Sequence, residues 1–86
     1  MINWSEVKEF TPILIEVFPL SEPIAAKFKS FSESENKVYY YEYGFVDTDH
    51  SWGIKSIGWA LASDCTTAKI LNTFDISMYN IMVEKN

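Results

Sequence analysis

Arginine is absent from this chain of 86 residues, and cysteine and histidine each occur only once. Proteins that bind nucleic acids neutralise phosphates with lysine and arginine, so the missing arginine and a net charge of -5 argue against direct DNA or RNA binding. The single Cys65 has no partner for an internal disulfide, which favours a reducing compartment. These scarcities make a basic protein the better electrostatic partner.

Long hydrophobic runs are also absent. The longest apolar stretch, residues 13–20, is interrupted by Glu16 and Pro19, whereas a membrane-spanning helix needs about 20 apolar residues. The first residues lack the basic region and the apolar stretch of a signal peptide. We therefore expect a soluble, cytoplasmic protein with no membrane partner.

The sequence contains no glycine-rich phosphate loop, nucleophile elbow or clustered zinc-ligand motif. Asp47, Asp49 and His50 offer oxygen and imidazole ligands in an expected turn, but zinc and calcium sites need more ligands, so we expect no metal and no cofactor. Cys65 and His50 are the residues on which a small enzyme would be built. That reading ranks third, and we expect the chain not to be an enzyme.

Hydrophobic and aromatic residues are plentiful, at 48% and 16% of the chain, which predicts a folded protein rather than a disordered one. The length suits one domain over residues 1–86. No internal repeat or linker divides it.

Two helices are expected in the N-terminal third. The first begins at Asn3 or Ser5, and Pro12 either kinks it or divides it into a short helix and an extended piece over residues 13–18. We favour a helix and leave the break at Pro12 open. A second, short helix is predicted by apolar residues at helical spacing, Ile24, Phe28 and Phe31.

The rest of the chain predicts a small antiparallel sheet, so the expected fold class is α+β. The sheet is built on a β-hairpin near residues 37–62, and a helix follows near residues 64–73. Residues 76–83 fit a C-terminal strand, and a helix nearly as well. We expect helices to cover one face of the sheet and to leave part of the tyrosine-bearing face accessible.

The first hairpin strand is rich in tyrosine. Because side chains alternate across a strand, one face would carry Tyr39, Tyr41, Tyr43 and Phe45, and the other Val38, Tyr40, Glu42 and Val46. Which face is buried is left open. Glycines inside the two strands, Gly44 and Gly58, indicate bulges or close backbone approach.

Aromatic and acidic side chains near the hairpin turn form the predicted partner-binding site. Tyrosine and tryptophan are enriched at protein interfaces, and carboxylates beside them suit lysine and arginine. Trp52 is expected to be exposed in the turn, and Trp4 and Trp59 to lie in the core. The site consists of Tyr40, Glu42, Tyr43, Asp47, Asp49 and Trp52.

These features predict an acidic protein-binding module that neutralises a basic partner. An immunity-type inhibitor of a toxic nuclease or a similar enzyme fits best, because an acidic surface fills a cationic cleft and charge accelerates the encounter. The alternative is a small self-associating module that forms a homodimer through a strand edge or a tyrosine face. The identity of the partner and the oligomeric state stay open.

Overall fold

A computed structural model of the chain describes residues 2–17, 23–45, 52–70 and 83–85. Strands account for most of these residues, and within them the only helices are two 3-10 helices of three residues each. The expected α+β class is therefore wrong, because the described part of the chain is built from antiparallel strands. The elements are η1 (Trp4–Glu6), β1 (Pro12–Ile15), β2 (Ile24–Ser32), β3 (Lys37–Phe45), β4 (Trp52–Leu61), η2 (Ala62–Asp64), β5 (Cys65–Ile70) and β6 (Val83–Lys85).

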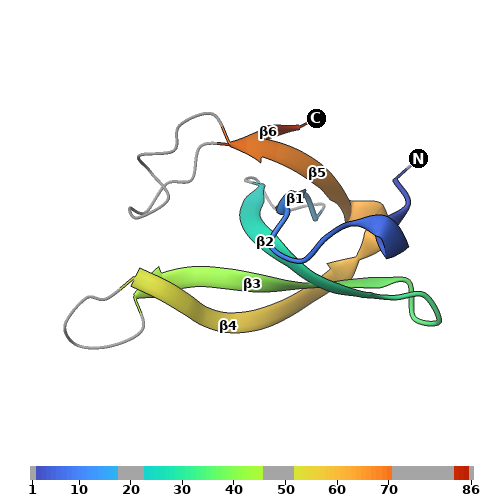
Figure 1. Cartoon of the computed structure of the whole chain (residues 1–86), viewed down its shortest axis with the longest axis horizontal. Coiled ribbons are helices and arrows are strands. Elements are labelled where there is room, and N and C mark those ends of the chain that lie inside the picture. Colours follow the sequence, from blue (N-terminus) through green and yellow to red (C-terminus); the bar gives the residue numbers. More distant parts are fainter. Residues whose placement is uncertain (1, 18–22, 46–51, 71–82, 86) are drawn as a thin grey trace.

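The six strands form one antiparallel sheet in the order β4-β3-β2-β1-β5-β6. Although β4 and β5 are consecutive in the chain, four strand spacings of about 4.8 Å each separate them in this order. The three residues of η2 rise only about 2 Å each, so a flat sheet would place β5 out of reach. The sheet therefore curls, with β3 and β4 running along one side of the molecule and β5 and β6 on the other (Figure 1).

The first expected helix is replaced by η1 and β1. Pro12 is the first residue of β1, a position at which a strand tolerates the missing backbone donor. Two β-branched residues, Ile13 and Ile15, then point into the core on alternate positions. The division at Pro12 into a short helix and an extended piece describes the segment better than a continuous helix.

The second expected helix is strand β2. Its core-facing residues imitate helical spacing because the register with β3 shifts between Phe28 and Ser30. Lys29 is the extra residue of this bulge, so the inward position moves from residue 30 to Phe31, which lies opposite Val38. The bulge thus produces the spacing of three between Phe28 and Phe31, whereas Ile24, four residues before Phe28, is exposed.

The helix expected near residues 64–73 is also wrong. Asp64 ends η2, and residues 65–70 form β5, which pairs with β1. Two consecutive threonines, Thr66 and Thr67, favour an extended backbone because their χ1 freedom is restricted in a helix. Residues 71–82 lie outside the described part of the chain, and Val83 begins β6.

The expected pairing within residues 37–62 is confirmed, since β3 and β4 are antiparallel neighbours. At Gly58 the expected close approach is also found: an added Cβ would lie 2.7 Å from Cζ of Tyr40. Gly44 lies opposite Gly53, one position beyond the register shift between Glu42 and Tyr43. Both glycines therefore lie at close approaches or irregularities of the strand pair.

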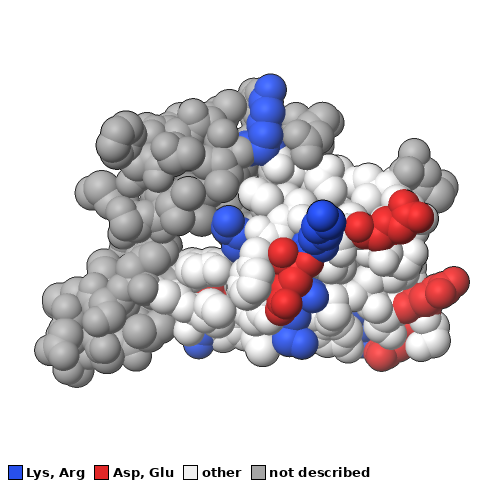
Figure 2. Space-filling model, viewed as in Figure 1, with Lys and Arg blue, Asp and Glu red and all other residues white. Residues whose placement is uncertain are grey.

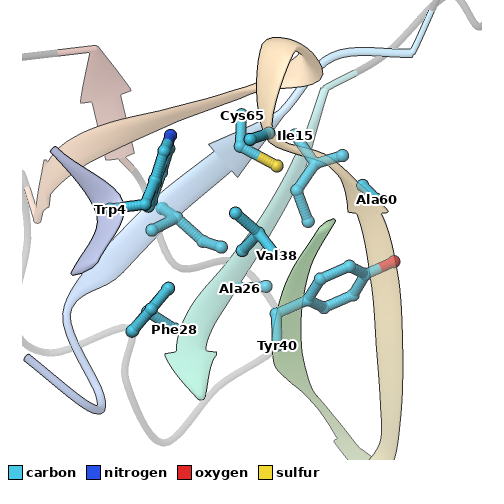
Figure 3. Close-up of a cluster of buried hydrophobic side chains, with 10 residues drawn as sticks. Trp4, Ile15, Ala26, Phe28, Val38, Tyr40, Ala60 and Cys65 are labelled. Carbon is cyan, nitrogen blue, oxygen red and sulfur yellow. The ribbon is translucent and has the colours of Figure 1, made fainter. Parts of the chain in front are cut away.

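The core lies on the inner side of the curled sheet (Figure 3). Trp4 is buried there as expected, and its ring stacks on Phe28 with the centroids 5.8 Å apart. Ile13 and Val38 are completely buried at the centre of the sheet. The buried cluster consists of Trp4, Ile13, Ile15, Ala26, Phe28, Val38, Tyr40, Ala60, Ala62 and Cys65.

Candidate functional site

The side of the β3–β4 pair that faces away from the core carries an exposed apolar surface. Directly opposed residues in antiparallel strands share a face, so the pairs Tyr39–Trp59 and Tyr41–Ile57 lie on the same side. The core-facing pairs, such as Val38–Ala60, lie on the other. We call this surface the outer face, and it consists of Tyr39, Tyr41, Tyr43, Ile54, Ile57, Trp59 and Leu61.

The outer face exposes large apolar side chains of β4. Ile57 and Trp59 are 55% and 54% exposed, and Ile54 and Leu61 are each 45% exposed. Scattered exposed apolar residues are normal, but contiguous patches on one face mark binding surfaces. The expectation that Trp59 lies in the core is wrong.

A turn before β1 extends the outer face. The ring of Phe10 stacks on Tyr41 with the centroids 5.2 Å apart and the planes inclined by 15°. Phe10 has a φ of 71°, a left-handed conformation that is strained for a bulky side chain. The hydroxyl of Tyr41 donates a hydrogen bond to the carboxylate of Glu9 in the same turn. Two contacts therefore fasten the turn to the tyrosine strand.

The ammonium group of Lys37 contacts the outer face. Nζ of Lys37 lies 4.0 Å from the centroid of the Trp59 ring and 3.1 Å from a carboxylate oxygen of Glu35. A tryptophan ring attracts cations through its negative face, and this attraction strengthens when the site is shielded from water. The Trp59 ring is thus presented in an orientation that accepts an ammonium group.

Three tyrosines of β3, Tyr40, Tyr41 and Tyr43, have a raised pKa and are protonated at neutral pH. Burial raises the pKa of Tyr40 and of Tyr43, and the hydrogen bond to Glu9 raises that of Tyr41. The hydroxyl of Tyr41 already donates to Glu9 and Tyr40 is buried in the core, so Tyr43 is the member of this group whose hydroxyl can donate to a carbonyl or carboxylate of a partner. This combination of apolar ring and polar tip is typical of interface residues.

The six residues of the predicted site are divided by the structure. Tyr40 is buried in the core against Gly58, so its ring contributes packing. Glu42 lies on the core side of β3 and accepts a hydrogen bond of 2.8 Å from Ser56. Tyr43 lies on the outer face, partly exposed.

The remaining members of that site lie outside what is described. Asp47 and Asp49 fall in residues 46–51. Trp52 begins β4 opposite Phe45, and its side chain is also outside the described part. The acidic half of the predicted site is therefore left as a prediction.

The residues that sequence reasoning missed are those of β4. The alternation of Ile57, Trp59 and Leu61 places them on one face, and pairing with Tyr39 and Tyr41 follows from the hairpin. This alternation could be recognised in the sequence, but the incorrect prediction that Trp59 lies in the core left β4 out of the predicted site.

Cys65 does not have the environment of a nucleophile. Burial, reinforced by the negative charge of Asp64, raises the pKa of its thiol to about 11. Cys65 is 4% exposed, and its thiol donates a 3.4 Å hydrogen bond to the carbonyl of Leu61. No helix dipole activates it, because the residue begins a strand. His50, the proposed imidazole, lies outside the described residues.

A hollow of about 540 Å³ opens beside the core, lined in part by Trp4, Phe31, Glu33 and Cys65. Among the lining residues only Glu33 and Cys65 titrate, and Glu33 is exposed to solvent. Within the described ranges no group of three or more acidic, histidine or cysteine side chains is placed to hold a metal ion. The hollow therefore has few lining side chains that could take part in acid–base or metal chemistry.

The helices of the described ranges are too short and too polar to cross a membrane. In comparisons with known proteins, no family model, no curated protein and no solved structure matched the chain. The outer face is the feature of the described residues that is typical of a functional surface.

Proposed function

We propose that the chain is a protein-binding module whose contact surface is the outer face of the β3–β4 pair. The observation that carries this proposal is the half-exposure of Ile57 and Trp59 beside the partly exposed Tyr39 and Tyr41. Interface cores are enriched in such aromatic residues and depleted of charge. The sheet holds these side chains on rigid strands, so a partner would order few of them on binding.

The size of the Trp59 side chain suggests how much it contributes. A tryptophan buries about 150–250 Å² in full, so half-exposed Trp59 offers about 100 Å². At about 25 cal/mol per Å², covering that area stabilises a complex by about 2.5 kcal/mol. This value equals that of an interface hot spot, and losing it would weaken binding about 60-fold.

The partner we propose is a basic protein. The chain has a net charge of -5, and Asp47 and Asp49 follow Phe45, the last residue of β3, by two and four positions in the sequence. The Lys37–Trp59 contact shows that this ring accepts an ammonium group, and a partner's lysine or arginine would take the place of Lys37 on it. Figure 2 shows acidic and basic side chains interspersed over the described surface in that view, so the charge would act mainly by steering the encounter.

More specifically, we propose that the chain is an immunity-type inhibitor of a toxic nuclease. A nuclease offers a cationic cleft for phosphate, and an acidic protein with an aromatic patch would occupy it without chemistry of its own. A role built on Cys65 is less well supported, because its thiol is buried and protonated at neutral pH.

The test compares three tagged forms of the chain in extract of the native host at low salt. We expect the wild-type chain to capture a basic protein in stoichiometric amount, and the double variant Ile57→Ala, Trp59→Ala to lose it. The control is Ile24→Ala, because Ile24 is 37% exposed on β2 and lies outside the outer face. Rising salt should elute the partner by weakening its electrostatic attraction.

Two results would contradict the proposal. Capture that survives the double variant would show that the outer face is not the contact surface. A stoichiometric partner that is acidic would remove the electrostatic argument. If the chain is an immunity-type inhibitor, we expect the captured protein to be a nuclease whose activity falls when the chain is added.

A further inference from the structure

The long outer strand β4 has an unpaired edge. Its only neighbour in the sheet is β3, and in the described part of the chain no strand pairs with its other side. An open row of backbone donors and acceptors is a template for another strand. The opposite end of the sheet is β6, whose three residues make it far shorter than the ten residues of β4.

One half of this edge is protected and the other is not. The register with β3 shifts so that Lys55 is the extra residue between Ile54 and Ser56. A bulge and a lysine are two devices by which proteins block edge pairing. Beyond Lys55 no charged residue occurs on β4, so residues 56–61 remain open for pairing.

We infer that this open edge pairs antiparallel with β4 of a second copy about a two-fold axis at Gly58. In an antiparallel pair, directly opposed residues share a face, whereas neighbouring residues of one strand point to opposite faces. The two-fold axis of a symmetric pair must therefore pass through a residue that lies opposite its own copy. Gly58 is the midpoint of residues 55–61, and centring there sets residues 56–60 of the open segment opposite the same residues of the second copy. The inference goes beyond the proposed function, because it concerns the strand edge and needs no other protein.

The segment is complementary to itself in this register. On the outer side each Ile57 lies opposite Trp59 of the partner copy, so apolar side chains meet apolar side chains. On the core side the opposed residues are small: Gly58 meets Gly58, and Ser56 meets Ala60. Lys55 lies opposite Leu61, which keeps the two lysines apart.

Charge favours Gly58 over Trp59 as the axis. An axis at Trp59 would set the two Trp59 rings directly opposite each other, and each ring already holds the ammonium of Lys37. The two lysines would then repel across the axis. With the axis at Gly58 the rings become diagonal neighbours, about 7–8 Å apart, and each retains its lysine.

A second copy fits this edge better than a cationic strand. None of residues 56–61 is acidic, so the edge strand itself offers a basic segment no ion pair, whereas its apolar side chains are matched by those of a second copy. Half-exposed Ile57, Trp59 and Leu61 provide less than the roughly 800 Å² per partner of a stable interface. The dimer should therefore be weak, with a dissociation constant of about 10 µM to 1 mM.

Sedimentation equilibrium of the purified chain between about 10 µM and 1 mM is the first test. We expect the average mass to rise with concentration from the monomer value of 9.9 kDa toward twice that value. A mass that stays at the monomer value throughout would overturn the inference.

Cysteine cross-linking tests the register. Opposed residues on an antiparallel pair are close enough for a disulfide, whereas diagonal residues are not. We expect an equimolar mixture of Ile57→Cys and Trp59→Cys to form a linked dimer under mild oxidation, and neither variant to do so alone. Both positions are exposed, so both variants should fold. The wild-type chain, which carries only buried Cys65, is the control.

Linkage of Trp59→Cys alone would place the axis at Trp59 and overturn the Gly58 register. If sedimentation shows a dimer but none of the cysteine samples becomes cross-linked, the edge pairing is wrong and the copies meet through their outer faces. Both experiments contain only this chain, so their outcome is independent of whether a basic partner is found.

Discussion

Replacing Gly58 with alanine separates two opposing effects. Gly58 does not have a positive φ, so alanine fits its backbone, and removing a glycine from a strand is expected to stabilise the protein by about 0.5–1 kcal/mol. The new Cβ would, however, lie 2.7 Å from Cζ and 2.8 Å from Cε1 of the Tyr40 ring. Relaxed carbon contacts are about 3.5–4.0 Å, so the ring must shift by about 1 Å.

The clash should win because Tyr40 is buried in the core and its ring has little room to move. Overpacking of this kind costs about 1–3 kcal/mol, so Gly58→Ala is expected to lower the free energy of unfolding by about 0.5–2 kcal/mol. A small domain would lose about 4–8 °C in Tm for each kcal/mol.

The matched control is the same substitution in a Tyr40→Leu background, where no ring lies over residue 58. There we expect Gly58→Ala to be neutral or to stabilise the protein by up to about 1 kcal/mol. Urea unfolding of the four proteins completes a double-mutant cycle, with a coupling of about 0.5–3 kcal/mol. An equal effect of Gly58→Ala in both backgrounds would refute the reasoning.

Three further predictions test other parts of the structure. Trp4→Ala should cost about 3–5 kcal/mol because the ring is buried, whereas exposed Trp59→Ala should cost less than about 1 kcal/mol; equal losses in chemical denaturation would contradict the assigned faces. Thr66→Val should raise stability by about 1 kcal/mol, because the buried Thr66 hydroxyl lacks a hydrogen bond in the described part of the chain; a loss would mean that this hydroxyl is paired. The raised pKa of Cys65 implies stability that is complete below about pH 9 and lost toward pH 11, by roughly 1–3 kcal/mol. The free energy of unfolding of Cys65→Ala should therefore fall less between pH 9 and pH 11 than that of the wild-type chain. Parallel pH profiles of the two proteins would contradict this.

The hairpin was predictable from the sequence, whereas the described residues form strands and two short 3-10 helices where α-helices were expected. The β3–β4 pair follows from alternating tyrosines and a turn-rich segment, which are local signals. For β2 the local signal is misleading. Its bulge at Lys29 turns a spacing of two into the spacing of a helix, and only the register with β3 reveals it.

The candidate site could be predicted only in part for a related reason. Alternation places Tyr39, Tyr41 and Tyr43 together, but it does not tell which side of a strand meets the core. That choice depends on Gly58, which leaves room for the ring of Tyr40 on the inner side. With Tyr40 buried, its odd-numbered neighbours and Trp59 must face outward.

The central claim is that partners bind at the outer face, and hydrogen–deuterium exchange with and without the captured basic protein tests it most directly. We predict that binding slows amide exchange in residues 37–45 and 52–61 and leaves residues 65–70 of β5 unchanged. Ile24→Ala should show the same pattern, and Trp59→Ala should show little protection at the same protein concentrations. Protection centred on β5, with the β3–β4 pair unchanged, would contradict the account.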